Sequence, residues 1–178
     1  MKSRKVNAKR NAGGSSKTIT DLVIELASHD GMERQHARER LVALGKPAVA
    51  PLLKVLKDDR ETVRWEAAKA FTELHDVAAA PALAVALEDP VADVRWLAAE
   101  ALVRLGQAGL APVLVALMRH SDSVELREAA HHVLHNLRAG ELAGIVEPVL
   151  RTLESYEPEL AVPFSAEEAL NALRRLGG

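Results

Sequence analysis

The sequence has no cysteine among its 178 residues and only five aromatic side chains: Trp65, Phe71, Trp96, Tyr156 and Phe164. Without thiols, neither a disulfide framework nor a thiolate metal site can form, and nothing indicates export to an oxidising compartment. No apolar run approaches the roughly 20 residues of a transmembrane helix, and no apolar segment of a signal peptide follows the basic N-terminus. These absences predict a soluble, cytoplasmic protein that has no membrane partner.

Acidic residues are missing from the start of the chain. Six basic residues lie in 1–20 with no acid among them, whereas residues 21–178 carry 17 basic and 25 acidic side chains, a net charge of −8. An acidic body argues against nucleic-acid binding, although a basic tail can still touch phosphate. We expect residues 1–17 to form a disordered, solubilising tail and residues 18–178 to form the folded domain.

The apolar content of 48% is mostly alanine, leucine and valine, which favours packed helices over sheets. The decisive feature is a repeat: the segment 63–71 returns as 94–102 at a shift of 31 residues, and Pro51, Pro81 and Pro112 follow nearly the same spacing. Partial copies flank these two segments, at 34–37 and at 126–130, where Ala129 and Ala130 keep the alanine pair in register. Apolar positions within each unit have helical periodicity on two stripes, so each unit is predicted to be two helices.

We therefore expect an all-α superhelix of about five helix pairs, at 18–45, 46–75, 76–106, 107–138 and 139–177. Asp30, Asp59 and Asp122 are placed to cap the second helices. The segments 18–21 and 165–168 fit the capping-box pattern and are predicted to begin the first and last helices. The last pair departs from the repeat, because a long prolyl connection at 157–163 precedes its final helix, and it is interpreted as a terminal cap.

The pattern Val-Arg-x-x-Ala-Ala-x-Ala-Leu-x-x-Leu-Gly, found within residues 91–106, resembles the short HEAT-like repeats of phycobilin lyase subunits and bacterial scaffold proteins. The resemblance is clear over about residues 30–138 and implies a HEAT-repeat solenoid. It also implies that the helix carrying Val-Arg lines a concave surface, with the two residues after that arginine pointing into it. On this basis the candidate partner-binding residues are Trp65, Glu66, Lys69, Glu73, Trp96, Leu97, Glu100, Arg104, Arg127 and His131.

Trp65 and Trp96 share one repeat position, and stacking of HEAT repeats would bring them within roughly 10 Å of each other. An exposed tryptophan pair beside Leu97 is typical of a binding hot spot, whereas the alternative is that both rings pack flat between repeats. Arg64 and Arg95 also recur, and their acidic turns at Asp59 and Asp93 favour a structural ladder of ion pairs and carbonyl contacts.

A metal site is a weaker hypothesis. His131 and His135 lie one turn apart, and Glu128 stands at the Glu-x-x-His spacing of di-iron proteins, but the neighbouring repeat offers Glu100 and Arg104 where further ligands would be needed. The sequence also has no glycine-rich phosphate loop, no Gly-x-Ser-x-Gly elbow and no His-Glu-x-x-His motif. We predict no bound metal, no cofactor and no catalysis.

The leading hypothesis is a non-catalytic scaffold that binds another protein or peptide on its concave face. One alternative, which rests on the repeat resemblance, is a phycobilin lyase or chaperone-like subunit, with Trp65, Trp96, Arg104 and Arg127 holding an open-chain tetrapyrrole. A second alternative is a DNA-binding HEAT-like protein, which the groove carboxylates Glu39, Glu66, Glu73 and Glu100 disfavour. The identity of the partner and the oligomeric state stay open.

Overall fold

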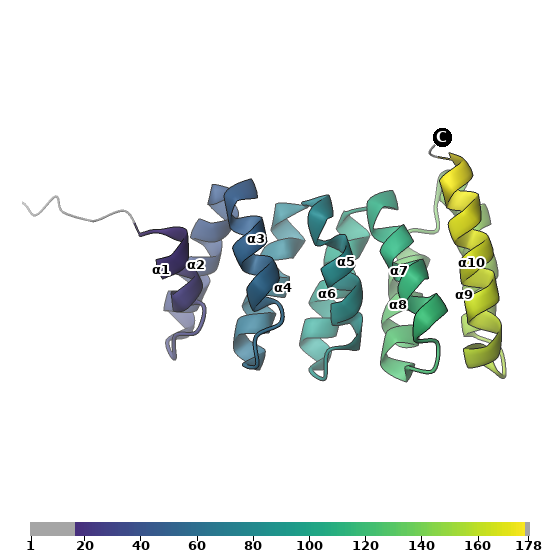
Figure 1. The fold of residues 1–178 in the computed structure, drawn as a ribbon, viewed down its shortest axis with the longest axis horizontal. Helices are drawn as coiled ribbons and strands as arrows, with labels where there is room; N and C mark the ends of the chain where they lie inside the picture. Colours follow the sequence, from purple (N-terminus) through teal and green to yellow (C-terminus); the bar gives the residue numbers. More distant parts are fainter. Residues whose placement is uncertain (1–16, 177–178) are drawn as a thin grey trace, which may run out of the picture.

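The computed structural model describes residues 17–176, and the regular elements in them are all helical. In chain order the α-helices are α1 (Ile19–Glu25), α2 (Gly31–Leu44), α3 (Lys46–Val55), α4 (Glu61–Leu74), α5 (Ala80–Val85), α6 (Ala92–Arg104), α7 (Gln107–Arg119), α8 (Val124–Asn136), α9 (Ala143–Leu153) and α10 (Pro158–Leu176). Short 3-10 turns, η1 (Val77–Ala79), η2 (Ala86–Glu88) and η3 (Gly140–Leu142), join some of them. The helices form five pairs stacked in a row (Figure 1), which confirms the predicted all-α solenoid.

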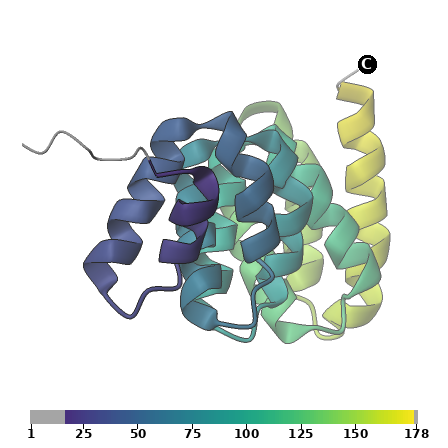
Figure 2. The ribbon, with the colours of Figure 1, turned by 60° about the vertical axis from the view of Figure 1, so that its left-hand side comes forward.

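Two parallel rows of helices make up the stack. Helices α1, α3, α5 and α7 form one row, and α2, α4, α6 and α8 form the other, where each packs on the next (Figure 2). Alanines on the facing sides, such as the fully buried Ala67 and Ala98, let the axes of α4 and α6 approach closely. Within the described part, no helix is long and apolar enough to span a bilayer.

In the terminal pair the two helices exchange rows: the first helix, α9, extends the row of second helices, and the second helix, α10, extends the row of first helices. Helix α9 packs on α8, and α10 packs on both α9 and α7, so the final helix continues the row of first helices. The basic segment predicted at 1–17 lies outside the described residues except for Lys17, whose ammonium pairs with the carboxylate of Glu25.

The predicted prolyl connection at 157–163 and the capping box at 165–168 are wrong, because α10 runs unbroken from Pro158 through Pro163. Pro163 has no N–H to offer the carbonyl four residues earlier, that of Glu159. The hydroxyl of Ser121, in the turn after α7, donates to this carbonyl at 2.9 Å instead. Ser165 is a buried residue, and its hydroxyl lies 2.6 Å from that of Thr152.

The helix starts agree with the prediction in part. The capping box of Thr18 with Asp21 and the cap at Asp30 are confirmed. The predicted cap at Asp122 is wrong, because the N-cap of α8 is Ser123, whose hydroxyl accepts the backbone N–H of Leu126.

Asp59 is also not a cap, because the N-cap of α4 is Arg60. The carboxylate that organises this turn is Asp58, which accepts the backbone N–H of Arg60 at 3.0 Å and its guanidinium at 2.8 Å and 2.9 Å. The hydrogen bond from the Arg60 side chain is the main cause that lowers the pKa of Asp58 to about 2.

Three second helices end on a residue with positive φ. Gly45 and Gly106 have φ of 68° and 60°, and the equivalent residue after α4 is His75, with φ of 48°. A side chain at such a position is disfavoured by roughly 1 kcal/mol relative to glycine, because its Cβ crowds the backbone.

The substitution His75→Gly is therefore expected to raise the free energy of unfolding by about 0.5–1 kcal/mol. Part of the gain from removing the Cβ is lost because glycine has greater conformational freedom in the unfolded chain. Urea denaturation followed by circular dichroism measures this difference. The matched control Gly106→Ala should lower the same free energy. A His75→Gly protein no more stable than the wild type would contradict this account of the helix end.

Candidate partner-binding face

A ladder of four arginines sets the position of the second helix in each of the first four pairs, α2, α4, α6 and α8. The Nη1 atoms of Arg34, Arg64 and Arg95 donate to the carbonyls of Ser28, Asp58 and Asp89 at 2.8–2.9 Å, and that of Arg127 donates to the carbonyl of Ser121. In each case the acceptor lies six residues earlier, in the turn before the helix. We call these four residues the ladder arginines.

The structural role predicted for Arg64 and Arg95 is confirmed, although the principal acid differs from the predicted ones. Arg64 also reaches into the next repeat, where its Nε and Nη2 donate to the two carboxylate oxygens of Asp89 at 2.7 Å and 3.0 Å. This paired contact raises the pKa of Arg64 above its ordinary value and ties the second repeat to the third.

The ladder corrects the predicted alignment of the fourth repeat. Alignment on the alanine pair gives a shift of 31 residues, but Arg127 follows Arg95 by 32. Position 128 therefore matches Trp96, and position 132 matches Glu100. The hydrogen bond between Glu100 and His132, 2.8 Å from Oε1 to Nε2, agrees with this alignment.

The corrected alignment defines the surface that we call the second-helix face. It consists of the residues one and five positions after each ladder arginine: Gln35, Glu39, Trp65, Lys69, Trp96, Glu100, Glu128 and His132. His132 was not among the predicted residues, because the repeat was aligned on its alanines; alignment on the arginine places His132 at this position.

Trp96 is the most prominent side chain of this face. Trp96 is 55% exposed, and its ring packs against the imidazole of His132, with ring centroids 4.5 Å apart. It lines a shallow pocket between α6 and α8 together with Glu125 and Glu128. Both carboxylates are exposed, and within residues 17–176 neither takes part in an ion pair.

Trp65 occupies the same repeat position, as predicted, but its surroundings differ. It is half-buried against the core, and the guanidinium of Arg38 lies 5.8 Å from its ring centre. The two tryptophans thus contact different helices, Trp65 a residue of α2 and Trp96 a residue of α8. Only Trp96 is largely exposed, so we treat it alone as an aromatic anchor.

Two predicted binding residues are buried and are therefore not available to a partner. Glu66 is 4% exposed and accepts from the guanidinium groups of both Arg34 and Arg38. Leu97 is 8% exposed and belongs to the hydrophobic core. One feature of the sequence could have indicated that Glu66 is buried. The preceding repeat has Arg38 at the position that Ala68 and Ala99 fill in the next two repeats, so a cation is available there to pair with a buried carboxylate.

The other predicted residues lie on or beside the second-helix face. Lys69 and Glu100 are half-buried within it, while Glu73 and Arg104 are exposed one further turn along. Arg127 is half-buried as a ladder arginine. His131 points away from the face, toward the turn after α9, where its Nε2 lies 3.0 Å from Oε1 of Glu154.

The histidines of α8 do not assemble ligands. His131 stacks on His135 with ring centroids 6.1 Å apart, and His132 turns toward Trp96. Among residues 17–176, no group of three or more histidine, aspartate or glutamate side chains is arranged to hold a metal ion.

Comparison with known proteins supports the repeat assignment. The family described as HEAT repeats matches residues 49–135. A chain of the complex of CpcE and CpcF of phycocyanin lyase from Nostoc sp. has a TM-score of 0.52 at 21% identity, covering 97% of this chain and 73% of that one. At this identity the likeness shows the fold alone.

Two further solved structures are less similar. A designed armadillo repeat protein in complex with the peptide (KR)4 has a TM-score of 0.45 at 19% identity, over 90% of each chain. An engineered protein has a TM-score of 0.44 at 20% identity, over 88% of this chain and 81% of that one. No curated protein matches the sequence.

The different roles of Glu66 and Glu73, both on α4, can be separated by their effect on stability. Glu66→Ala should lower the free energy of unfolding by about 3 kcal/mol, because it leaves two arginines without their buried counter-ion. Glu73→Ala, at an exposed position, should change it by less than about 0.5 kcal/mol. Equal effects of the two substitutions in urea denaturation would contradict the structural role of Glu66.

Proposed function

We propose that the chain is a non-catalytic module of the HEAT-repeat type, and that its second-helix face binds a basic segment of a protein or peptide partner. The observation that carries this proposal is the exposed ring of Trp96 among unpaired carboxylates. A large aromatic ring left in water is disfavoured in a free protein and is typical of a residue that a partner covers.

The charge around Trp96 determines the chemistry of the partner. Glu125 and Glu128 lie beside its ring, and Asp93 is exposed one turn earlier on the same helix. Arg95 also lines this pocket, but its Nη1 donates to the turn carbonyls of Asp89 and Pro90, and it forms no ion pair with Glu125 or Glu128. A lysine or arginine of the partner could stack on the indole ring and pair with these carboxylates.

The acids in the first turns also stabilise the helix ends through the helix dipole, but that role does not require an exposed tryptophan between them. The same carboxylates disfavour a nucleic-acid backbone, and they disfavour the propionates of a tetrapyrrole. Of the two cations predicted to hold such propionates, Arg127 donates to the carbonyl of Ser121, whereas Arg104 is exposed.

Fluorescence anisotropy with a labelled peptide of alternating arginine and serine tests this proposal. The wild type should bind it, and Trp96→Ala should weaken binding by about tenfold or more. Replacing Glu125 and Glu128 with glutamine should weaken binding and reduce its salt dependence, because fewer charges take part.

Two controls make the result specific. Tyr156→Ala removes an exposed aromatic ring elsewhere and should leave binding unchanged, and a peptide with glutamate in place of arginine should not bind. Equal affinity of the wild type and the folded Trp96→Ala protein for the basic peptide would contradict the proposed site.

A further inference from the structure

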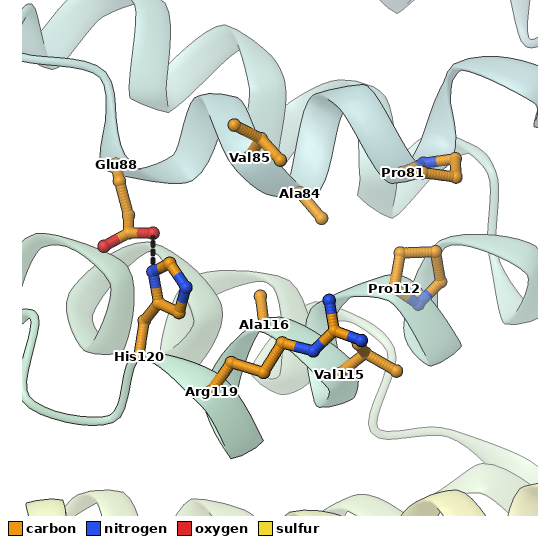
Figure 3. Close-up of a pocket in the computed structure, with 9 residues that line it drawn as sticks. All are labelled: Pro81, Ala84, Val85, Glu88, Pro112, Val115, Ala116, Arg119 and His120. Atoms are coloured by element: carbon orange, nitrogen blue, oxygen red, sulfur yellow. Dashed lines mark hydrogen bonds and ion pairs between the residues drawn. The ribbon is translucent and has the colours of Figure 1, made fainter.

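The opposite side of the stack carries an apolar groove between α5 and α7, shown in Figure 3. Its walls are small or apolar residues at matching repeat positions: Pro81, Ala84 and Val85 from α5, and Pro112, Val115 and Ala116 from α7. Val85 is 63% exposed, so its side chain is largely uncovered.

A small side chain on α5 contributes to the groove. Ala84, which lines it, stands where α7, 31 residues later, has the larger Val115. The helix is also short, with 3-10 turns on both sides. The missing side-chain volume leaves a depression over the row of first helices that the chain does not fill itself.

The rim of the groove is charged at one end. His120 Nδ1 lies 2.9 Å from Oε2 of Glu88 and bridges the two helices there. The neighbouring Arg119 is exposed, and Figure 3 shows its side chain lying along the groove toward Val115. In the described part of the chain, no carboxylate pairs with Arg119.

A second unpartnered surface lies on α10. Leu160 and Phe164, one turn apart on its outward side, are 61% and 73% exposed. Glu167 and Glu168 continue this side of the helix and are also exposed. The outward side of α10 is thus an apolar stripe followed by acids, which matches an apolar groove edged by an arginine.

We propose that the chain forms a homodimer in which the Leu160–Phe164 stripe of each copy docks into the α5–α7 groove of the other. The aromatic ring of Phe164 fills the space over Ala84, and Arg119 pairs with the carboxylates that follow the stripe. Because α5, α7 and α10 lie in the same row, both copies can dock at once, and the reciprocal exchange closes the dimer. This contact does not involve Trp96, so it stands or falls separately from the proposed function.

Sedimentation velocity from about 1 to about 100 µM protein tests the dimer. The wild type should reach twice the monomer mass, and Val85→Asp and Phe164→Ser should each weaken association by about tenfold or more. Arg119→Glu should weaken it too, without changing any apolar side chain. The matched control Ile24→Ser changes an equally exposed apolar residue at the other end of the stack and should associate as the wild type does.

Mixing the two interface variants distinguishes reciprocal docking from other contacts. Val85→Asp retains an intact stripe and Phe164→Ser retains an intact groove, so an equimolar mixture should recover one contact and form heterodimers. A wild type that stays monomeric throughout would overturn the proposal. So would dimers that survive both substitutions, or a mixture of folded variants that stays monomeric.

Discussion

The contact from each ladder arginine to a carbonyl of the preceding turn is the interaction on which the other features depend. The turn can neither rotate nor lengthen without losing this bond, so the starts of α2, α4, α6 and α8 are held in the same orientation. The residue after the arginine then points outward in each repeat, which places Gln35, Trp65, Trp96 and Glu128 along one face. The position of the second-helix face is therefore a consequence of this structural hydrogen bond.

The repeats share one backbone arrangement but carry different side chains at equivalent positions, and these side chains give each repeat its own surface. The position two residues after the ladder arginine holds Glu66 in one repeat and Leu97 in the next, and both are buried. The buried carboxylate of Glu66 is balanced by Arg38, from the preceding repeat, which stands at a position that alanine fills in the next two repeats. A charged residue at a repeat position is thus not sufficient to identify a binding residue, because a side chain of opposite charge in the adjacent repeat can pair with it and keep it buried.

Local patterns predicted the helix pairs, their limits, the structural role of Arg64 and Arg95 and the shared position of the two tryptophans, because each depends mainly on the pattern within one unit. Local patterns gave wrong predictions where contacts between residues far apart in the sequence determine the structure. Helix α10 continues through Pro163 because Ser121, far earlier in the chain, donates to the carbonyl that the proline leaves free. The single extra residue before Arg127 likewise moved His132, not His131, beside Trp96.

Recognition of a partner at Trp96 is the central claim, and the indole N–H resonances of the two tryptophans test it most directly. In a ¹⁵N-labelled protein, each resonance can be assigned by its loss in the corresponding phenylalanine variant. Titration with the arginine–serine peptide should shift the Trp96 signal strongly and saturably, with smaller changes at the half-buried Trp65. A peptide that binds while the Trp96 signal stays in place would contradict the account.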